Sequence, residues 1–302
     1  MEMRRCLINI AAVSAMLTCF AEVSARNGLA GNIQDYADAS GAEIGVAVIG
    51  SDGDTTVVND GYYPMNSVLK MFQALPAAKK LSERGVMLCD TVEVERSVLQ
   101  QNTWSPMLTD YTDPVIALPY ARLFEYALAQ SDNNACDILF ERAASIDETL
   151  AYWRQAGIGE FDIKWNEAEM HDAPVRSDDN RTTPLAAAKA ISVMMPYCMT
   201  SSDYNTSNIG MMLLNCSTGK GRIPRPLEGT GAQVAHKTGT GFEDAQGNPT
   251  GVNDVAWILL PDGRAYTLAV FVKTTPACMA QTEAMIADIS RIVYDYYACQ
   301  NM

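Results

Sequence analysis

Alternating, β-branched segments lie near both ends of this 302-residue chain, and helical periodicity fills the stretch between them. "AEIGVAVIG" (Ala42 to Gly50) predicts a strand, and "DTTVVND" predicts its hairpin partner across the turn at residues 51–53. Near the other end, "QVAHKTG", "NDVAWILLP" and "AYTLAVFVK" predict three further strands. Because strands from both ends are expected to meet in one antiparallel sheet, the helical stretch has to be an insertion.

The helical segments define the two parts of this plan. "NIQDYADAS" (Asn32 to Ser40) predicts a leading helix, and Thr183-Pro184 predicts a helix start. One apolar face predicts a closing helix and consists of Met285, Ile289, Ile292 and Tyr296. We expect an α/β (α+β) fold, with an antiparallel five-stranded sheet flanked by the terminal helices and an inserted all-helical domain. The sheet domain comprises residues 26–60 and 215–302, the helical domain comprises residues 61–214, and the active site lies between them.

Composition narrows the class of partner. An apolar fraction of 48% provides a sizeable core, and a charged fraction of 19% argues against general disorder. The net charge of −14 argues against nucleic acid and anionic membranes as partners. Small molecules are therefore the expected partners, and we expect the protein to be a monomer.

The first 25 residues have the three-part pattern of a signal peptide. Arg4 and Arg5 form a basic start, residues 6–20 form a short apolar core, and residues 23–25 are small. A buried N-terminal helix fits this pattern less well, and a lipoprotein signal is disfavoured because no small residue directly precedes Cys19. Later stretches are too short to span a bilayer. We expect a periplasmic or secreted protein with no membrane contact after cleavage.

Eight cysteines are present, and the predicted cleavage removes Cys6 and Cys19. The other six are Cys89, Cys136, Cys198, Cys216, Cys278 and Cys299. An oxidising compartment would permit disulfides, but six cysteines allow about 15 complete pairings and the sequence does not choose among them. Buried free thiols are the alternative for several of them.

The stretch "YYPMNSVLKMF" (Tyr62 to Phe72) places Ser67 at a predicted helix start and Lys70 one turn later. Unpaired N–H groups at a helix start favour negative charge, which suits an oxygen nucleophile. In a buried cleft near another cation, the pKa of Lys70 would fall and the amine could act as a base. Taken alone, the pair is better explained as a capping serine followed by a solvated lysine.

Two further triplets change this interpretation. Ser131-Asp132-Asn133 lies between two predicted helices, and Lys237-Thr238-Gly239 ends a predicted strand. Ser-x-x-Lys, Ser-Asp-Asn and Lys-Thr-Gly in this order are typical of class A β-lactamases and penicillin-binding proteins. With "TWSPML", "SDNNACDIL" and "AHKTGTG", the mature chain resembles class A serine β-lactamases along essentially its whole length. It is most similar to a cephalosporinase, extended-spectrum branch with an altered, lengthened Ω loop.

The resemblance assigns roles to the first two motifs. It implies that Ser67 is the acylated nucleophile and that Lys70 activates it. Ser131 would relay a proton to the departing lactam nitrogen, and Asn133 would hold the side-chain amide of the substrate. Asp132 would be structural and tie down its loop.

The third motif would bind the substrate carboxylate. The resemblance implies that Lys237 attracts this carboxylate and that Thr238 and Thr240, on either side of Gly239, hydrogen-bond to it. The backbone N–H groups of Ser67 and Thr240 would form the oxyanion hole.

"KWNEAEMHDAP" matches the Glu-x-Glu-x-Asn pattern of the family, except that histidine replaces the asparagine. Glu167 would hold the water that removes the acyl group, and Glu169 would be structural. His171 stands where an asparagine usually helps to position this water. Because histidine side chains generally titrate near pH 6.5, we expect hydrolysis to depend on pH in the mildly acidic range. Whether Lys70 or Glu167 takes the acylation proton is left open.

Two departures from the family pattern concern the rim of the cleft. The usual Arg–Asp salt bridge of the Ω loop falls on Trp165 and Asn180, so the loop must be held in another way. The linker "FEDAQGNPTGVN" is longer than in many relatives. Both features would widen the cleft and favour bulky oxyimino-cephalosporins. Cysteines typical of class A carbapenemases are absent at Asn66 and Gly241, so carbapenem hydrolysis is not expected.

Two more residues complete the predicted site. Arg222 matches a position that can anchor the carboxylate, with Arg225 as the competing choice and a surface arginine as the alternative. Trp104 would form a wall of the cleft, or else be a half-buried structural aromatic. His236 has no ligand spacing for zinc, and we expect neither a metal nor an organic cofactor.

The expected reaction is hydrolysis of penicillins, and especially cephalosporins, through acylation of Ser67 and deacylation assisted by Glu167. Antibiotic resistance would be the result. Two alternatives remain: a penicillin-binding D-alanyl-D-alanine peptidase or esterase, and a sensor domain that stays acylated. Glu167 argues against the first, and the lack of a transmembrane signalling part argues against the second.

Overall fold

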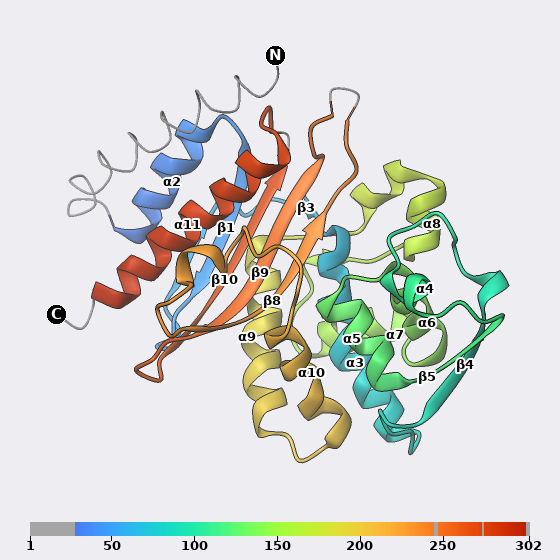
Figure 1. Cartoon of the computed structure of the whole chain (residues 1–302). Coiled ribbons are helices and arrows are strands. Elements are labelled where there is room, and N and C mark those ends of the chain that lie inside the picture. Colours follow the sequence, from blue (N-terminus) through green and yellow to red (C-terminus); the bar gives the residue numbers. More distant parts are fainter. Residues whose placement is uncertain (1–27, 245–246, 274, 300–302) are drawn as a thin grey trace.

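The computed structural model describes residues 28–244, 247–273 and 275–299 (Figure 1). The predicted signal peptide lies outside these residues. Within the described ranges, none of the helices combines the length and apolar character needed to cross a membrane.

One five-stranded sheet, ordered β2-β1-β10-β9-β8, joins the two ends of the chain (Figure 1). Its strands are β1 (Glu43–Ile49), β2 (Thr55–Val58), β8 (Gln233–Thr240), β9 (Gly251–Leu259) and β10 (Ala265–Lys273). All neighbours are antiparallel. The five predicted strands and the fold class are therefore confirmed, and β8 lies at the edge nearer the helical part.

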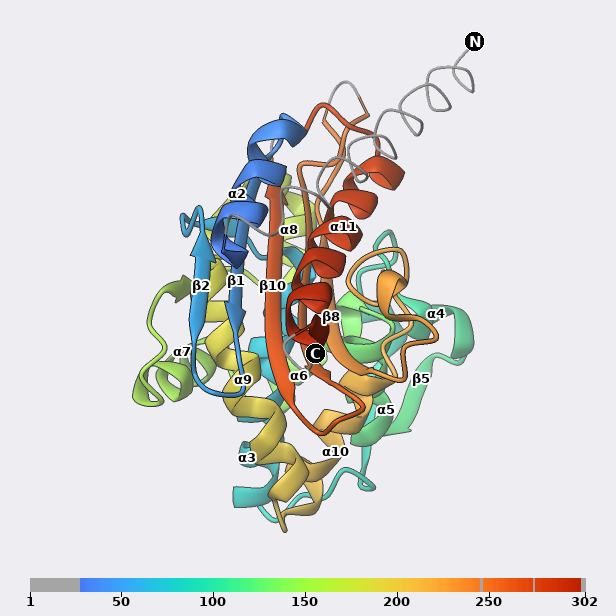
Figure 2. The same cartoon turned by 90° about the vertical axis from the view of Figure 1, so that its left-hand side faces the viewer.

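The terminal helices α2 (Leu29–Ser40) and α11 (Met279–Cys299) lie together on one face of the sheet (Figure 2). Of the predicted apolar face of α11, Ile289 is fully buried and Met285 and Ile292 pack against the core, but the prediction is wrong for Tyr296, which is 42% exposed. The buried apolar side chains of α11 are those of Ile286, Ala287, Ile289, Val293 and Tyr297. Tyr297 stacks on Tyr266 of β10 with ring centroids 4.7 Å apart, and this contact fixes the rotation of the helix.

Helix α9 (Pro184–Thr200) packs on the opposite face of the sheet. Its predicted start is confirmed, since the Thr183 hydroxyl accepts a hydrogen bond from the Ala186 N–H at 3.1 Å and Pro184 occupies the first turn. Four alanines of its buried side permit a close approach to the strands. Although α9 belongs to the predicted helical domain, it covers the sheet; the domain boundaries themselves stay a prediction.

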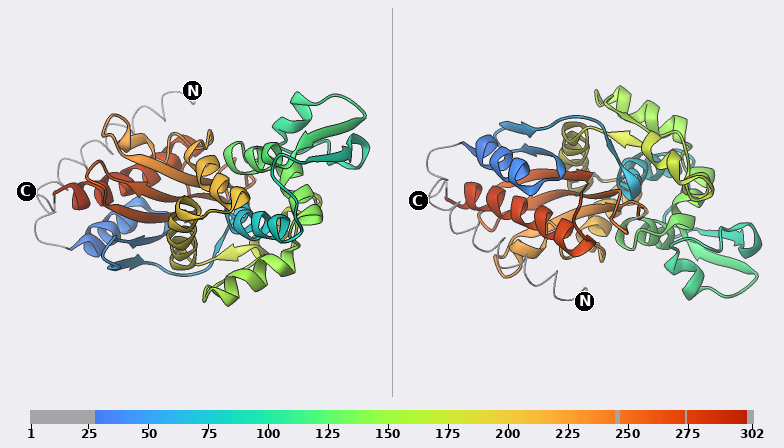
Figure 3. Two further views of the ribbon diagram at one scale, coloured as in Figure 1. Left: turned by 90° about the horizontal axis from the view of Figure 1, so that it is seen from below. Right: turned by 90° about the horizontal axis from the view of Figure 1, so that it is seen from above.

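The helical part is built around α3 (Leu69–Glu83), which follows a 3₁₀ turn at Asn66–Val68. Its Phe72 stacks on Phe161 at 4.6 Å, and the Phe72 carbonyl accepts a hydrogen bond from the Trp153 indole at 2.7 Å. The surrounding helices are α4 (Pro106–Asp110), α5 (Tyr120–Ala129), α6 (Asn133–Arg142), α7 (Ile146–Gln155), α8 (Glu167–Asp172) and α10 (Tyr204–Leu214). The short strands are β3 (Tyr63–Pro64), β4 (Thr91–Glu95), β5 (Val115–Pro119), β6 (Phe161–Asp162) and β7 (Arg181–Thr182). In Figure 3, α3 lies between the sheet and these outer helices.

Five of the predicted mature cysteines have described side chains, and all five are free thiols. Cys136 and Cys198 are buried, as the sequence allowed. The thiol of Cys216 is half-buried, while Cys89 and Cys278 are exposed. The side chain of Cys299 lies outside the description.

Candidate active site

The serine of the first motif lies in the 3₁₀ turn that precedes α3. Asn66, just before Ser67, has a left-handed backbone with φ of 47°, which asparagine tolerates better than most residues. Strand β9 braces this turn, since the Asn253 side-chain amide donates to the carbonyls of Pro64 at 2.8 Å and Met65 at 3.2 Å. The sheet thus fixes the backbone from which Ser67 projects.

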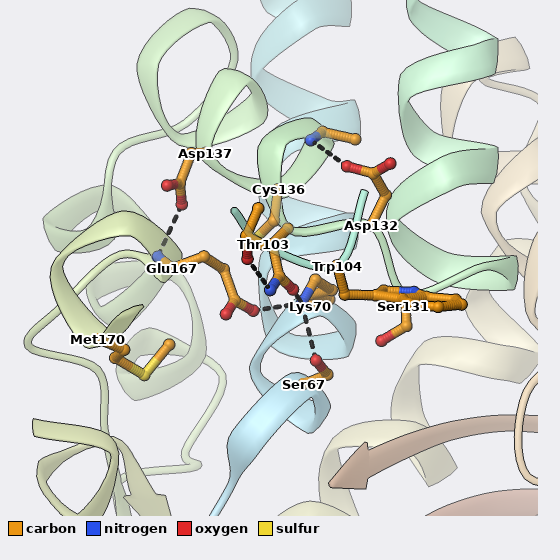
Figure 4. Close-up of polar contacts among 12 residues, drawn as sticks. Ser67, Lys70, Thr103, Trp104, Ser131, Asp132, Cys136, Asp137, Glu167 and Met170 are labelled. Carbon is orange, nitrogen blue, oxygen red and sulfur yellow. Dashed lines mark hydrogen bonds and ion pairs between the residues drawn. The ribbon is translucent and has the colours of Figure 1, made fainter. Parts of the chain in front are cut away.

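Lys70 connects the nucleophile to two other predicted residues (Figure 4). Its Nζ donates to Ser67 Oγ at 2.8 Å and to Asn133 Oδ1 at 2.9 Å. The same Nζ forms a salt bridge with the Glu167 carboxylate. The Lys70 side chain is fully buried and Glu167 is buried beside it, whereas Ser67 and Asn133 are half-buried.

The expectation that the pKa of Lys70 falls is wrong. Burial alone would lower the pKa, but the Glu167 carboxylate in contact with Nζ, with a further contribution from Asp137, holds it above its ordinary value. The prediction considered a nearby cation and did not include a carboxylate within the same pocket. Lys70 is therefore an ammonium paired with Glu167 in the resting site.

The second motif faces the third across the cleft. Ser131 has a left-handed backbone with φ of 61° between α5 and α6, and its Oγ accepts a hydrogen bond from Lys237 Nζ at 2.9 Å. Burial lowers the pKa of Lys237 to about 7, and the nearby Lys70 ammonium acts in the same direction. The lysine with the lowered pKa is thus on the β8 side of the site.

Asp132 has the structural role that the sequence predicted. It caps α6 by accepting from the Ala135 N–H at 2.9 Å, and it accepts from Ser105 Oγ at 2.9 Å and the Met107 N–H at 2.7 Å. One buried carboxylate therefore joins the start of α6 to the loop before α4.

That loop also supplies the rim of the site. Asn133 Nδ2 donates to Thr103 Oγ1 at 2.8 Å. The sequence did not single out Thr103 as a site residue. The neighbouring Trp104 has a ring that is 63% exposed, and its indole N–H donates to the Gln130 carbonyl at 2.9 Å. Trp104 is therefore a fixed, accessible aromatic surface beside Asn133 and not a half-buried one.

Strand β8 approaches the nucleophile backbone very closely. A Cβ at Gly239 would lie 2.4 Å from the Met65 carbonyl oxygen, so a side chain there requires a backbone shift. Beside it, the Thr238 hydroxyl hydrogen-bonds to the Thr218 hydroxyl at 2.6 Å. Thr240, next along the strand, is exposed. The motif glycine is therefore explained by contact between two backbones.

Arg222 is buried beneath the end of β8. Its guanidinium donates to the carbonyls of Gly239 at 3.0 Å and Asn253 at 2.9 Å, and to Thr240 Oγ1 at 2.7 Å. The Glu283 carboxylate accepts from its Nε at 3.0 Å. Arg225 is exposed, so Arg222 is the arginine that reaches the site.

Glu167 opens α8, whose start is closed by a capping box. Asn166 Oδ1 accepts from the Glu169 N–H at 2.8 Å, and Glu169 Oε2 accepts from the Asn166 N–H at 3.0 Å. Glu169 is therefore structural, as predicted.

Asp137 anchors the Ω loop, and sequence reasoning missed it. Its two carboxylate oxygens accept from the N–H groups of Glu167 at 2.8 Å and Ala168 at 2.9 Å (Figure 4). Burial, followed by the charge of Glu167, raises the pKa of Asp137 to about 7. A usable signal was present, since Asp137 follows Asn133 by four residues and so lies on the same face of α6.

Asn180 occupies one of the two positions of the usual salt bridge and holds the loop through hydrogen bonds instead. Its Oδ1 accepts from the N–H groups of Lys164 at 2.8 Å and Trp165 at 3.1 Å, and its Nδ2 donates to the Trp165 carbonyl at 2.7 Å. The prediction that the loop is held in another way is confirmed.

Comparison with known proteins agrees with this geometry. The model of the "Beta-lactamase enzyme family" matches residues 28–297. The chain is 38% identical to a β-lactamase of Phocaeicola vulgatus, over 89% of this chain and 84% of that protein. It is 32% identical to the extended-spectrum β-lactamase PER-1 of Pseudomonas aeruginosa, over 84% and 82% of the two chains. The chain belongs to the class A serine β-lactamase family.

Solved structures of this family support the assignment. A class A β-lactamase from Bacteroides cellulosilyticus superimposes with a TM-score of 0.82 at 29% identity, over 89% of this chain and 96% of that one. The extended-spectrum β-lactamase TLA-3 superimposes with a TM-score of 0.83 at 30% identity, over 89% and 98%. This β-lactamase is therefore a hydrolase that acts on β-lactams, and the expected similarity to extended-spectrum members is confirmed.

The β-lactamase has a less defined arrangement at His171. This residue is half-buried on α8, and no described residue hydrogen-bonds to its ring. Met170 is buried beside Glu167, where its sulfur accepts from Asn180 Nδ2 at 3.2 Å (Figure 4). The role of His171 in positioning water stays a prediction. In the part of the chain that the structure describes, no cluster of three His, Cys, Asp or Glu side chains could hold a metal ion.

Proposed function

We propose that this β-lactamase hydrolyses penicillins and, preferentially, cephalosporins through an acyl-enzyme on Ser67 that Glu167 helps to remove. The observation that carries the proposal is the contact of Lys70 Nζ with Ser67, Asn133 and Glu167 at once. A protein that only traps β-lactams does not need a carboxylate at this position.

Acylation would use the Ser67–Lys70–Glu167 chain of contacts. Glu167 takes a proton from the Lys70 ammonium, and the neutral amine then takes the proton of Ser67 as its oxygen attacks the lactam carbonyl. The proton therefore ends on Glu167, so both residues share the role of base. The N–H groups of Ser67 and Thr240 would stabilise the oxyanion, each by about 3–4 kcal/mol.

Ring opening requires a proton on the lactam nitrogen. Ser131 Oγ would give this proton, because Lys237 Nζ at 2.9 Å can replace it. A pKa of about 7 lets Lys237 give and take protons near neutral pH. Before deacylation, Glu167 loses its proton to solvent and Lys237 regains one. Glu167 then takes a proton from the water that attacks the ester, and Lys70 passes a proton to Ser67 Oγ as it leaves.

Substrate would be held at both ends. The carboxylate would meet the Lys237 ammonium and the Thr240 hydroxyl, with Thr238 beside them and Arg222 adding positive charge from below Thr240. Asn133 is positioned to hold the side-chain amide, because Lys70 and Thr103 fix the orientation of its own amide. Trp104 would pack against the bound substrate.

Oxyimino-cephalosporins are the proposed preference within this class. The Ω loop lacks the usual salt bridge. Hydrogen bonds to Asp137 of α6 and from Asn180 hold the loop instead. The long linker that follows Thr240 would add to the opposite rim. PER-1 and TLA-3, which are similar over most of their length, are both extended-spectrum enzymes by name. We further propose export to the periplasm or medium, a monomeric state and a role in antibiotic resistance.

The intact mass of the mature protein in excess cefotaxime or penicillin, followed over time, tests this proposal. An adduct on Ser67 that clears as the drug disappears supports it, and Ser67→Ala should form no adduct. An adduct that persists would instead indicate a penicillin-binding or sensor protein. Hydrolysis of penicillins with cefotaxime left intact would refute the cephalosporin preference alone.

A further inference from the structure

A cysteine, a histidine and an aspartate are neighbours around β8. Asp254 of β9 is fully buried, and its Oδ1 lies 2.9 Å from Nδ1 of His236, which is 3% exposed. The thiol of Cys216, the second residue after α10, lies near the His236 ring, and the two groups interact electrostatically. An acid that orients an imidazole, which in turn contacts a thiol, is an arrangement that activates cysteine nucleophiles.

The surroundings of the thiol favour its charged form. The charged groups around it are His236 and Lys237 on β8, with Asp254 of β9 behind the imidazole. Cys216 Sγ also lies 3.4 Å from the Thr218 hydroxyl. Burial opposes ionisation, but His236 and Lys237 outweigh it and lower the pKa of Cys216 to about 7. Burial would keep His236 neutral, but Asp254 and Cys216 raise the pKa of the imidazole to about 10.

We propose that Cys216, His236 and Asp254 form a thiol modification site, in which Cys216 attacks small sulfur electrophiles and thereby weakens capture of the substrate carboxylate. The thiol is half-buried, so a small reagent has access to it. With methyl methanethiosulfonate, the Cys216 sulfur forms a disulfide with the S-methyl group, and methanesulfinate leaves with the electron pair. The thiol proton passes to solvent, because His236 already carries a proton that Asp254 stabilises near neutral pH.

The modification would reach catalysis by two routes. The Cys216 thiolate supports the ammonium form of Lys237, so capping the thiolate removes negative charge beside this lysine. The added methyl group also presses on Thr218, whose hydroxyl lies 2.6 Å from that of Thr238. If the pKa of Lys237 fell by about one unit, its protonated fraction at pH 7 would drop about fivefold. This coupling rests on the proposed function, whereas the labelling does not.

Labelling with methyl methanethiosulfonate between pH 5.5 and 9, followed by peptide mapping, tests the site. Cys89 and Cys278 serve as exposed reference thiols, and Cys136 and Cys198 serve as buried ones. We expect Cys216 labelling to rise with a midpoint near pH 7. In His236→Asn, labelling at pH 6 should fall roughly fivefold, since fewer thiolates outweigh their greater nucleophilicity. A midpoint above pH 8, or no labelling of Cys216, would overturn the site even if the variant failed to fold.

Hydrolysis of a chromogenic cephalosporin by the labelled enzyme tests the coupling. KM at pH 7 should rise about fivefold with little change in kcat, and dithiothreitol should reverse the rise. Cys216→Ser should not respond to the reagent. An unchanged KM in fully labelled enzyme would overturn the coupling, while the pH profile of labelling would still support the site. Absence of any hydrolysis before labelling would contradict the proposed function and leave the thiol chemistry intact.

Discussion

Lys70 and Lys237 are both fully buried on opposite sides of one cleft, yet their pKa values move in opposite directions. On the nucleophile side, the Glu167 carboxylate contacts Lys70 and raises its pKa. On the β8 side, Lys237 contacts only neutral oxygens of Ser131 and Thr238, so burial dominates and its pKa falls to about 7. The comparison teaches that burial lowers the pKa of an amine unless a carboxylate in contact with it outweighs the burial.

The largest effect is expected from Glu167→Gln, which tests this contrast at Lys70. The glutamine keeps the size of the side chain but removes the charge, so Lys70 loses the group that raises its pKa and the water loses its base. We expect deacylation to slow by about 10²–10⁴-fold and the acyl-enzyme to accumulate. Rapid-quench mass spectrometry would measure both steps. Glu169→Gln is the matched control, because it alters only the helix cap; equal loss of deacylation in both variants would contradict the assignment.

The second test concerns Lys237 and pH. Because its pKa is about 7, the ammonium is mostly present at pH 6 and mostly lost at pH 8. KM for a carboxylate-bearing β-lactam should therefore rise up to about tenfold between these values. Lys237→Arg keeps its charge throughout this range and should give a flatter KM profile. Parallel profiles for the two proteins would show that Lys237 does not titrate there.

A third test removes one of the two oxygens through which Asp137 holds the start of α8. Asp137→Asn leaves one oxygen to accept from the N–H groups of Glu167 and Ala168, so we expect a loss of about 1–3 kcal/mol in the free energy of unfolding. The pH dependence has a defined sign. Since the folded pKa of about 7 lies above the usual unfolded value, the stability from this group is full below about pH 4 and is lost as pH rises to 7.

Urea unfolding of both proteins at several pH values would measure this. The stability difference between wild type and Asp137→Asn should shrink from pH 4 to pH 7, and a constant difference would contradict the raised pKa of Asp137. A wild-type loop that unfolds independently of the rest would also be visible as a separate transition.

The smallest effect is expected from His171→Asn. No described residue hydrogen-bonds to the His171 ring, so its replacement should cost little stability. If the ring helps to hold the deacylating water, the pH–rate profiles of kcat for the two proteins should differ. Superimposable profiles would remove His171 from the mechanism.

The sequence predicted most of the fold because its strands alternate clearly and its motifs are local. Ser67, Lys70, Ser131 and Lys237 converge as expected, and Thr183-Pro184 begins a helix. The errors concern contacts that depend on the path of the chain. The carboxylate beside Lys70 comes from a residue 97 positions away, and Asp137 meets Glu167 across 30 positions. The spacing of residues within a motif does not predict contacts between residues so far apart in the sequence.

The closing helix shows a second kind of limit. Its apolar residues form two adjacent stripes, and a pattern of three- and four-residue steps fits both of them. In the structure, Ile286, Ile289, Val293 and Tyr297 face the sheet, and Tyr297 stacks on Tyr266. Cys216 and Asp254 were missed for a similar reason, because neither belongs to a recognisable motif and both meet His236 only after the sheet has formed.

The contact at Gly239 sets the separation between β8 and the turn that carries Ser67. Where Gly239 faces the Met65 carbonyl, two main chains touch without an intervening side chain, and this contact sets how far Thr240 lies from Ser67. If the N–H groups of Ser67 and Thr240 form the proposed oxyanion hole, mutations in the outer loops should change which substrates enter the cleft without changing the separation of these two groups. We therefore expect substrate range and catalysis to depend on different parts of the chain, which leaves the rim free to diversify.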